Sequence, residues 1–131
     1  MLIRTSAWDD VGGFDEAYFF YFEDADICRR LRLAGHGILF QPSSCIVHFG
    51  GGSDPLSNPQ IVRAYRREQL RYYARYNSVV QFYLLKMYLL TKFLLLAARG
   101  GLDRSTSRTL ISDILNFRRS EGAIHHTRKR T

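Results

Sequence analysis

The chain has 131 residues, a formal net charge of +7 and 46% hydrophobic residues. That length permits one domain with a modest core. Two cysteines, Cys28 and Cys45, exclude a disulfide framework, and Cys45 with His48 supplies too few ligands for a closed zinc site. The composition therefore fits a protein of the reducing cytoplasm.

Charge is divided unequally along the chain. Residues 1–59 hold four Arg and eight acids, a net of −4, whereas residues 60–131 hold fifteen Lys or Arg and four acids, a net of +11. This division predicts that the second half faces phosphates, either of an anionic membrane or of nucleic acid.

The first elements are short. Residues 1–4 resemble a buried strand, and Thr5 with Ser6 is typical of a helix N-cap. We expect a short helix that ends at Gly12-Gly13, with Trp8 as a packing residue.

An aromatic run, Phe19 to Phe22, leads directly into three acids, Glu23, Asp24 and Asp26, which open a helical pattern. At about 100° per residue, Asp24 lies at the centre of an apolar arc. Asp26 falls on the opposite side, where it can pair with arginines three and four positions later. An unpaired carboxylate on an apolar face costs several kcal/mol unless something uses or satisfies it. Asp24 is therefore the functional candidate.

The alternative is that Asp24 or Glu23 only caps the helix by accepting first-turn backbone hydrogen bonds. On spacing alone, capping is slightly favoured.

Gly35 is expected to end this helix. The runs 37–41 and 44–48 are β-rich and separated by Pro42, so we expect two strands. His48 then lies at a strand end before a loop, residues 50–53, whose backbone suits an approach to phosphates, although repeated glycine is a weak signal.

Several motifs occur together in order: Gly12 to Glu16, the aromatic run, Glu23-Asp24-x-Asp26, Gly35, Pro42, and His48 with Gly50 to Ser53. This series resembles the C-terminal part of the catalytic domain of family 2 glycosyltransferases. Within that family it is most similar to bacterial rhamnosyltransferase-like members that build cell-surface polysaccharide. The resemblance extends to about Ser53, and it implies an α/β fold, a partial GT-A-type sandwich.

The resemblance also implies roles for individual residues. Asp24 would be the general base that removes a proton from an acceptor sugar hydroxyl. Glu23 and Asp26 would position the acceptor or the helix, and Tyr21 and Phe22 would shape the acceptor pocket. His48 would join a divalent metal site, Mg or Mn. The remaining candidates, which would contact the donor phosphates, are Gly51, Gly52 and Ser53.

Related enzymes carry an Asp-x-Asp metal motif upstream, together with the nucleotide-sugar site. No such motif precedes Glu23-Asp24 here, and Asp24-Ala25-Asp26 belongs to the acceptor-side helix. The resemblance thus predicts a fragment, inactive by itself, whose main metal ligands lie in a missing N-terminal half.

The second half is expected to be helical. Asn58-Pro59 is a helix start, and arginines recur at helical spacing after it. Residues 79–98 are apolar apart from Lys86 and Lys92 and are about as long as a bilayer core is thick. Two central lysines favour a helix lying in the membrane interface over a spanning one, and a core helix of a larger assembly stays open.

Residues 105–119 are expected to form an amphipathic helix, and residues 120–131 a disordered basic tail. The predicted division is a catalytic part, 1–59, a membrane-associating extension, 60–119, and the tail.

The sequence predicts an inverting glycosyltransferase part that moves a sugar, with rhamnose as first candidate, from a nucleotide-sugar donor to a lipid-linked or cell-surface glycan. It would act at the cytoplasmic face of the cell membrane. The alternative is an inactive remnant that acts as a basic module on membranes or on nucleic acid, with nucleic acid the less favoured partner.

Overall fold

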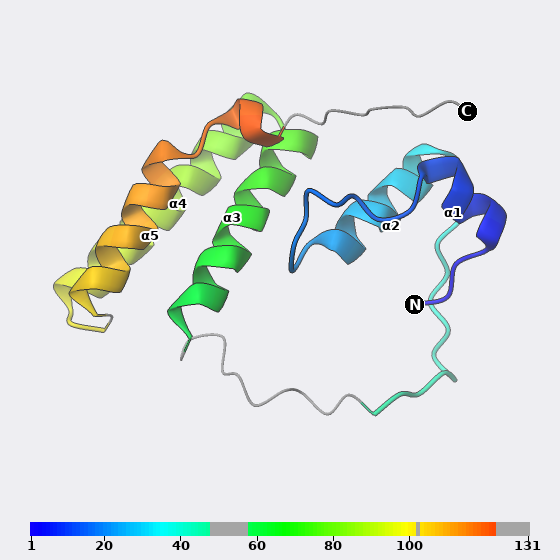
Figure 1. Ribbon diagram of the computed structural model, residues 1–131, viewed down its shortest axis with the longest axis horizontal. Helices are drawn as coiled ribbons and strands as arrows, with labels where there is room; N and C mark the ends of the chain where they lie inside the picture. Colours follow the sequence, from blue (N-terminus) through cyan, green and yellow to red (C-terminus); the bar gives the residue numbers. More distant parts are fainter. Residues whose placement is uncertain (48–57, 102, 123–131) are drawn as a thin grey trace.

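A computed structural model describes residues 1–47, 58–101 and 103–122 of the chain. Within these residues the elements are α1 (Thr5–Val11), α2 (Glu23–Leu33), α3 (Pro59–Tyr76), α4 (Val79–Ala98), α5 (Arg104–Asn116) and a 3-10 helix, η1 (Arg119–Gly122). Helices α3, α4 and α5 run side by side, and α1 with α2 lies beyond α3 (Figure 1).

The pair α1 and α2 encloses a small apolar cluster. Ala7 of α1 packs with Ile27 and Leu31 of α2, and the half-buried Trp8 covers them. Trp8 also meets the ring of Phe14 edge-on, with centroids 5.0 Å apart. The prediction of Trp8 as a packing residue is therefore confirmed.

Glycines end both helices as expected. Gly12, at φ 73°, caps α1 in the left-handed conformation that glycine adopts without steric cost. At the end of α2, the N–H of Gly35 donates to the carbonyl of Arg32, and the N–H of His36 donates to that of Leu31. These two bonds form a Schellman motif.

Helices α3, α4 and α5 form an antiparallel bundle with the main core. Each begins at a residue suited to capping. Asn58 accepts from Gln60 N–H, Ser78 and Gln81 form a capping box, and Asp103 accepts from the first-turn amides of α5. The core residues of the bundle are Leu70, Ala74, Phe82, Leu89, Phe93, Leu110, Ile114 and Phe117.

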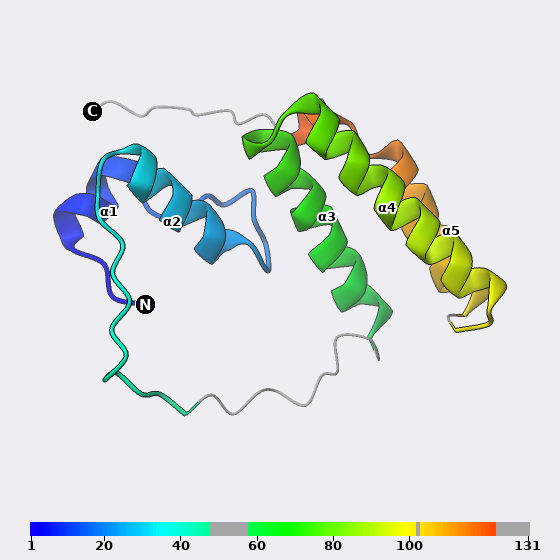
Figure 2. The ribbon, with the colours of Figure 1, turned by 180° about the vertical axis from the view of Figure 1, so that it is seen from behind.

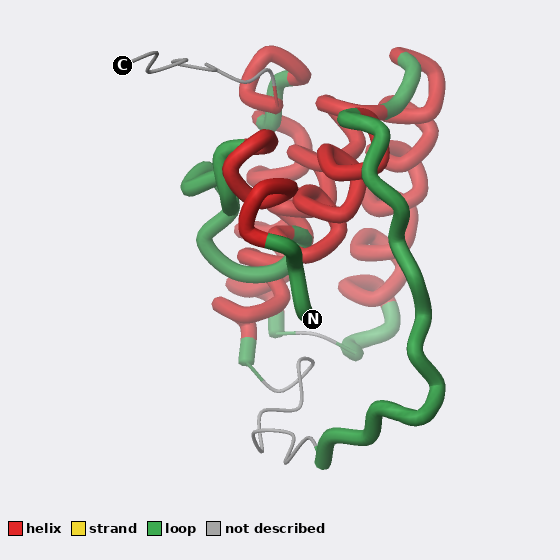
Figure 3. Tube along the Cα trace, turned by 90° about the vertical axis from the view of Figure 1, so that its right-hand side faces the viewer, coloured by secondary structure: helices red, strands yellow, loops and turns green. Residues whose placement is uncertain are grey.

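The predicted α/β fold, a partial GT-A-type sandwich, is wrong for the part of the chain that the structure describes. Residues 1–4, 37–41 and 44–47 contain no strand there, and Figure 3 traces the segment after α2 as an extended loop. A strand needs a neighbour to satisfy its backbone N–H and C=O groups. These runs have none within the described residues, and the side chains of residues 38–41 and 44–47 are exposed, with Leu39 at 93% and Phe40 at 90%.

The first three residues of the expected disordered tail are ordered. Ser120 to Gly122 belong to η1, and Gly122 is buried so closely on α3 that an added Cβ would lie 2.9 Å from the carbonyl oxygen of Arg71. The other expected tail residues, 123–131, lie outside the described residues.

Candidate functional site

The turn that leads into α2 has unusual backbone geometry. Tyr21 has φ 73° and Phe22 has φ 68°, and the described residues contain no other non-glycine residue with positive φ. Bulky side chains rarely adopt this conformation, which costs about 1–3 kcal/mol per residue. The turn persists only if its surroundings hold it.

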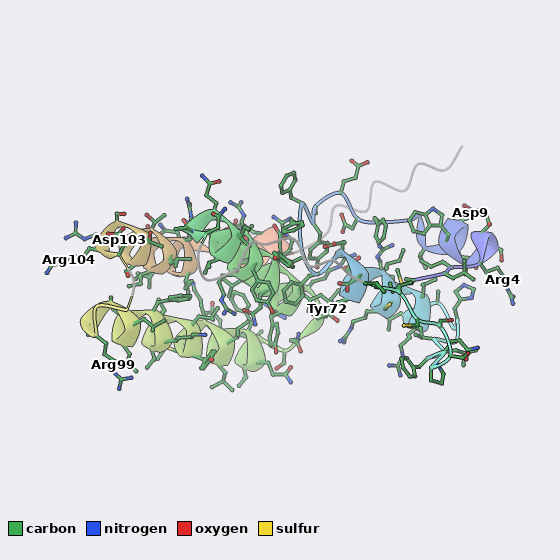
Figure 4. All side chains as sticks on the ribbon, turned by 90° about the horizontal axis from the view of Figure 1, so that it is seen from below. Arg4, Asp9, Tyr72, Arg99, Asp103 and Arg104 are labelled. Atoms are coloured by element: carbon green, nitrogen blue, oxygen red, sulfur yellow. The ribbon has the colours of Figure 1, made fainter. Side chains whose placement is uncertain are left out.

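Aromatic side chains of α3 supply that support. The ring of Phe22 lies 5.3 Å from that of Tyr65 and 5.5 Å from that of Tyr72, and the ring of Tyr21 lies 5.2 Å from that of Tyr65. Figure 4 places Tyr72 between α3 and α2. Such aromatic pairs contribute about 0.5–1.5 kcal/mol each beyond the area they bury. Helix α3 therefore stabilises the strained turn that presents Glu23 and Asp24.

Asp26 is the most deeply buried charged residue near this turn. Its side chain is 0% exposed and accepts hydrogen bonds from Arg30 Nε at 2.7 Å, Arg75 Nη1 at 2.7 Å and Tyr76 Oη at 2.6 Å. Because two of these donors lie on α3, the carboxylate ties α2 to the C-terminal end of α3.

Arg30 extends the same network toward α1. Its two terminal nitrogens donate to the carbonyl oxygens of Val11 and Gly13, each at 2.6 Å. The planar guanidinium fork thus links α2, the end of α1 and the following loop. The predicted pairing of Asp26 with an arginine four positions later is confirmed.

Arg75 also donates to Asp15, at 2.7 Å. Burial raises the pKa of Asp15, but the Ala17 N–H and the Arg75 guanidinium outweigh it and hold that pKa below its usual value. Burial alone would lower the pKa of Arg75. The charge of Asp26 and the other partners of Arg75 outweigh this effect, so the net shift of the pKa is upward. Burial and the hydrogen bond to Asp26 raise the pKa of Tyr76. Each charge in the network is therefore stabilised by an opposite one.

The expected orientations of the two acids are wrong. Asp24 is exposed, and its Oδ1 accepts from the N–H of Ala25 at 2.7 Å, whereas Asp26 is enclosed. The buried face of α2 is centred between Ile27 and Arg30, about 90° from Asp24 at 100° per residue. Asp26 has no surface for an acceptor to touch, so of its two predicted roles only holding the helix agrees with the structure.

The other candidates are divided between described and undescribed residues. Tyr21, Phe22 and Glu23 lie together with Asp24 at the start of α2, and Glu23 is half-buried. His48, Gly51, Gly52 and Ser53 fall outside the described residues. Among the described residues, no three His, Cys, Asp or Glu side chains gather closely enough to hold a metal.

Most arginines of α3 lie close to acidic side chains of the protein itself. Arg63 pairs with Asp113 of α5 at 2.7 Å, Arg71 lies 3.4 Å from Glu68, and Arg75 joins the Asp26 network. The predicted use of these arginines against phosphates stays a prediction.

Glu68 is a second buried acid, on the side of α3 that faces the turn. It is 5% exposed, and burial raises its pKa more than the Arg71 and Arg67 charges lower it. Its Oε2 has no hydrogen-bond partner.

We expect Glu68→Gln to stabilise the protein at neutral pH. A carboxyl group whose pKa is higher in the folded state favours folding while it is protonated, and that contribution is lost as the pH rises through the folded-state pKa. Glutamine lacks the buried charge. The gain in Tm over the wild type should therefore be larger near pH 7.5 than near pH 4, where both side chains are neutral. The exposed Glu16→Gln is the matched control, and an equal gain in both variants would contradict the burial argument.

Sequence reasoning missed Arg75 and Tyr76 as partners of the acid-bearing helix. They lie 49 and 50 residues after Asp26, beyond the reach of any periodicity. Their one signal in the sequence is the presence of aromatic residues among the arginines of residues 63–76.

Comparison with known proteins agrees with the resemblance. The family described as "Glycosyltransferase like family 2" matches residues 1–75. An "N-acetylglucosaminyl-diphospho-decaprenol L-rhamnosyltransferase" of Mycobacterium tuberculosis is 44% identical over 61 residues, which cover 44% of this chain and 20% of the relative. "Rhamnosyltransferase WbbL" of Escherichia coli is 36% identical over 75 residues, 57% of this chain and 28% of the relative.

The chain thus spans only 20% of the length of the first relative and 28% of the length of the second. No solved structure matches it significantly. The family match includes the whole of α2 and ends at Arg75, so it contains most of the network around Asp26. Because this match covers more than half of its residues, the chain belongs to glycosyltransferase family 2.

Proposed function

We propose that the chain is part of an inverting glycosyltransferase that moves rhamnose from a nucleotide-sugar donor, dTDP-rhamnose as first candidate, to a lipid-linked or cell-surface glycan. The observation that carries this proposal is the family match over residues 1–75, together with two relatives named as rhamnosyltransferases. The printed name of the Mycobacterium tuberculosis relative includes a diphospho-decaprenol, which supports a lipid-linked acceptor.

In this proposal Asp24 is the general base. Its carboxylate takes the proton of an acceptor hydroxyl while the hydroxyl oxygen bonds to the anomeric carbon and the bond from that carbon to the nucleoside diphosphate breaks. Attack opposite the leaving group inverts the anomeric configuration. The exposed position of Asp24 in the first turn of α2 supports this role because an acceptor can reach it.

Tyr21, Phe22 and Glu23 would contact the acceptor beside this base. The proposal also places His48 in a divalent metal site, Mg²⁺ or Mn²⁺, with Gly51, Gly52 and Ser53 at the donor phosphates. The resemblance alone supports that part, and we derive no step through the metal. The reaction would take place at the cytoplasmic face of the cell membrane.

The test is transfer by the intact enzyme. It is incubated with a panel of nucleotide sugars and a polyprenyl-diphosphate-linked acceptor in detergent micelles, and product is followed by mass spectrometry. We expect transfer from dTDP-rhamnose, with inversion visible in the anomeric NMR coupling. Transfer from another donor would change the sugar in the proposal and leave the proposed glycosyl transfer in place. No transfer from any donor would overturn the proposal and leave the alternative of a non-enzymatic basic module.

A further inference from the structure

The outer side of α4 is an apolar surface that the bundle leaves uncovered. Helix α4 is 20 residues long, contains no acid, and is apolar enough to cross a membrane by length and composition. Only one side of it packs in the bundle, through Phe82, Leu89 and Phe93. Figure 2 shows α4 in front of α5, with its other side turned outward.

The outward side chains form a continuous stripe, which we call the outer face of α4. At about 100° per residue they span an arc of roughly 140°. Each of its large apolar members is at least 50% exposed: Val80, Tyr83, Leu84, Met87, Tyr88, Leu94 and Leu95. Exposed apolar surface of this extent marks an interaction site in soluble proteins.

Polar groups that would oppose burial of this face are already satisfied. Thr91 is the polar residue in the middle of the stripe, and its hydroxyl donates to the carbonyl of Met87 at 2.9 Å. Lys86 points away from the stripe, and its Nζ donates to the carbonyl oxygens of Leu115 and Phe117 at the end of α5, at 2.9 and 3.0 Å. The Thr91 hydroxyl and the Lys86 charge therefore keep their partners when the face loses water.

Cationic side chains follow one edge of the same face. Lys92 and Arg99 lie with Tyr88, Leu95 and Leu96 around a shallow hollow on α4. Figure 4 shows Arg99 projecting outward from the end of α4, with Arg104 at the same end of the bundle. An apolar stripe with tyrosines and a cationic edge matches the boundary between acyl chains and anionic lipid headgroups.

We propose that the outer face of α4 lies flat on an anionic lipid bilayer, with Lys92 and Arg99 at the headgroup phosphates. Crossing the bilayer would require α4 to separate from α3 and α5, which would break both Lys86 hydrogen bonds and expose Phe82, Leu89 and Phe93. A position in the membrane plane keeps all of these contacts. This inference rests on the proposed membrane location of the enzyme and names the surface that provides it.

The first experiment is co-sedimentation of the intact protein with vesicles of phosphatidylglycerol and phosphatidylcholine, against vesicles of phosphatidylcholine alone. Changing Leu84, Leu94 and Leu95 together to Gln should lower the partition coefficient at least about tenfold, because each exposed leucine would bury apolar surface in the lipid. The matched control changes three leucines exposed elsewhere, Leu33, Leu39 and Leu115, to Gln and should bind like the wild type.

The charge arm compares two double variants. Lys92→Gln with Arg99→Gln should reduce binding to the anionic vesicles severalfold while leaving the weak binding to neutral vesicles unchanged. Arg4→Gln with Arg32→Gln, on the α1 and α2 side, is the control of equal charge. Circular dichroism of each variant checks that the helices are retained.

Several results would overturn the inference. Equal binding of the two leucine triples would show that the outer face does not contact lipid. Resistance of the wild type to extraction by alkaline carbonate would show that α4 spans the bilayer. A protein dimer that the α4 triple converts to a monomer, without vesicle binding by the wild type, would assign the face to a second copy. Binding is measured without substrates, so a protein that binds vesicles and transfers no sugar contradicts only the proposed function.

Discussion

Asp26→Asn is expected to destabilise the folded protein by about 3–5 kcal/mol, the cost of removing one partner from a buried ion pair. Arg30 and Arg75 would keep their charges with side-chain exposures of only 10% and 6% and would lose the carboxylate that both contact. Urea denaturation, followed by circular dichroism, measures the loss as a lower midpoint.

Asp24→Asn is the control for this experiment, since it makes the same chemical change two residues away on the same helix. Asp24 is exposed, and a surface substitution of this kind changes stability by no more than about 0.5 kcal/mol. A double-mutant cycle with Arg75→Gln then isolates the coupling across the interface of α2 and α3. If Asp26→Asn unfolds at the same urea concentration as Asp24→Asn, the buried network does not hold α2.

The opposite contrast is expected for catalysis. In the intact enzyme, Asp24→Asn should lower kcat by ~10² to 10⁴, the usual contribution of a general base. Asparagine keeps the shape of the side chain and removes its basicity, so donor binding and the urea midpoint should remain near the wild-type values. The measurement is initial-rate transfer at saturating donor, together with donor affinity by calorimetry.

Asp9→Asn, an exposed acid on α1, is the matched control and should retain full activity. A fully active Asp24→Asn enzyme would remove Asp24 from the mechanism and leave it as a first-turn acid that stabilises α2. A variant with lower activity and an equally lowered urea midpoint would assign a structural role. Comparison of Asp24→Asn with Asp26→Asn therefore distinguishes a catalytic role from a structural role.

Local signals in the sequence predicted the helices well. The apolar run of residues 79–98 has the bounds of α4 to the residue, since Ser78 and Gln81 cap it on one side and Gly100 follows it on the other. Asn58-Pro59 and Gly12 likewise mark the ends of elements where capping chemistry requires them. Capping and periodicity act within a few residues, and a single sequence contains them fully.

Interactions between distant residues were beyond the sequence. A helical wheel built from apolar residues placed Asp24 on the buried face because it ignored that Arg30 is also enclosed. Arg75 and Tyr76 of α3 help to enclose Asp26, and nothing in their sequence spacing relates them to α2. The prediction of strands was wrong for a related reason. A β-rich composition indicates a local preference for extended backbone, whereas a strand also requires a neighbouring strand with which to pair.

The separation in sequence between Asp26 and its partners Arg75 and Tyr76 also has a consequence during protein synthesis. Ribosomes add about 5–20 residues per second, so roughly 2 to 10 s pass between incorporation of Asp26 and of Arg75, 49 residues later. During that interval the 11-residue α2 is too short to be stable alone, and its carboxylate stays hydrated. The nascent acid-bearing helix therefore cannot reach its native packing until the polypeptide has been made to Tyr76.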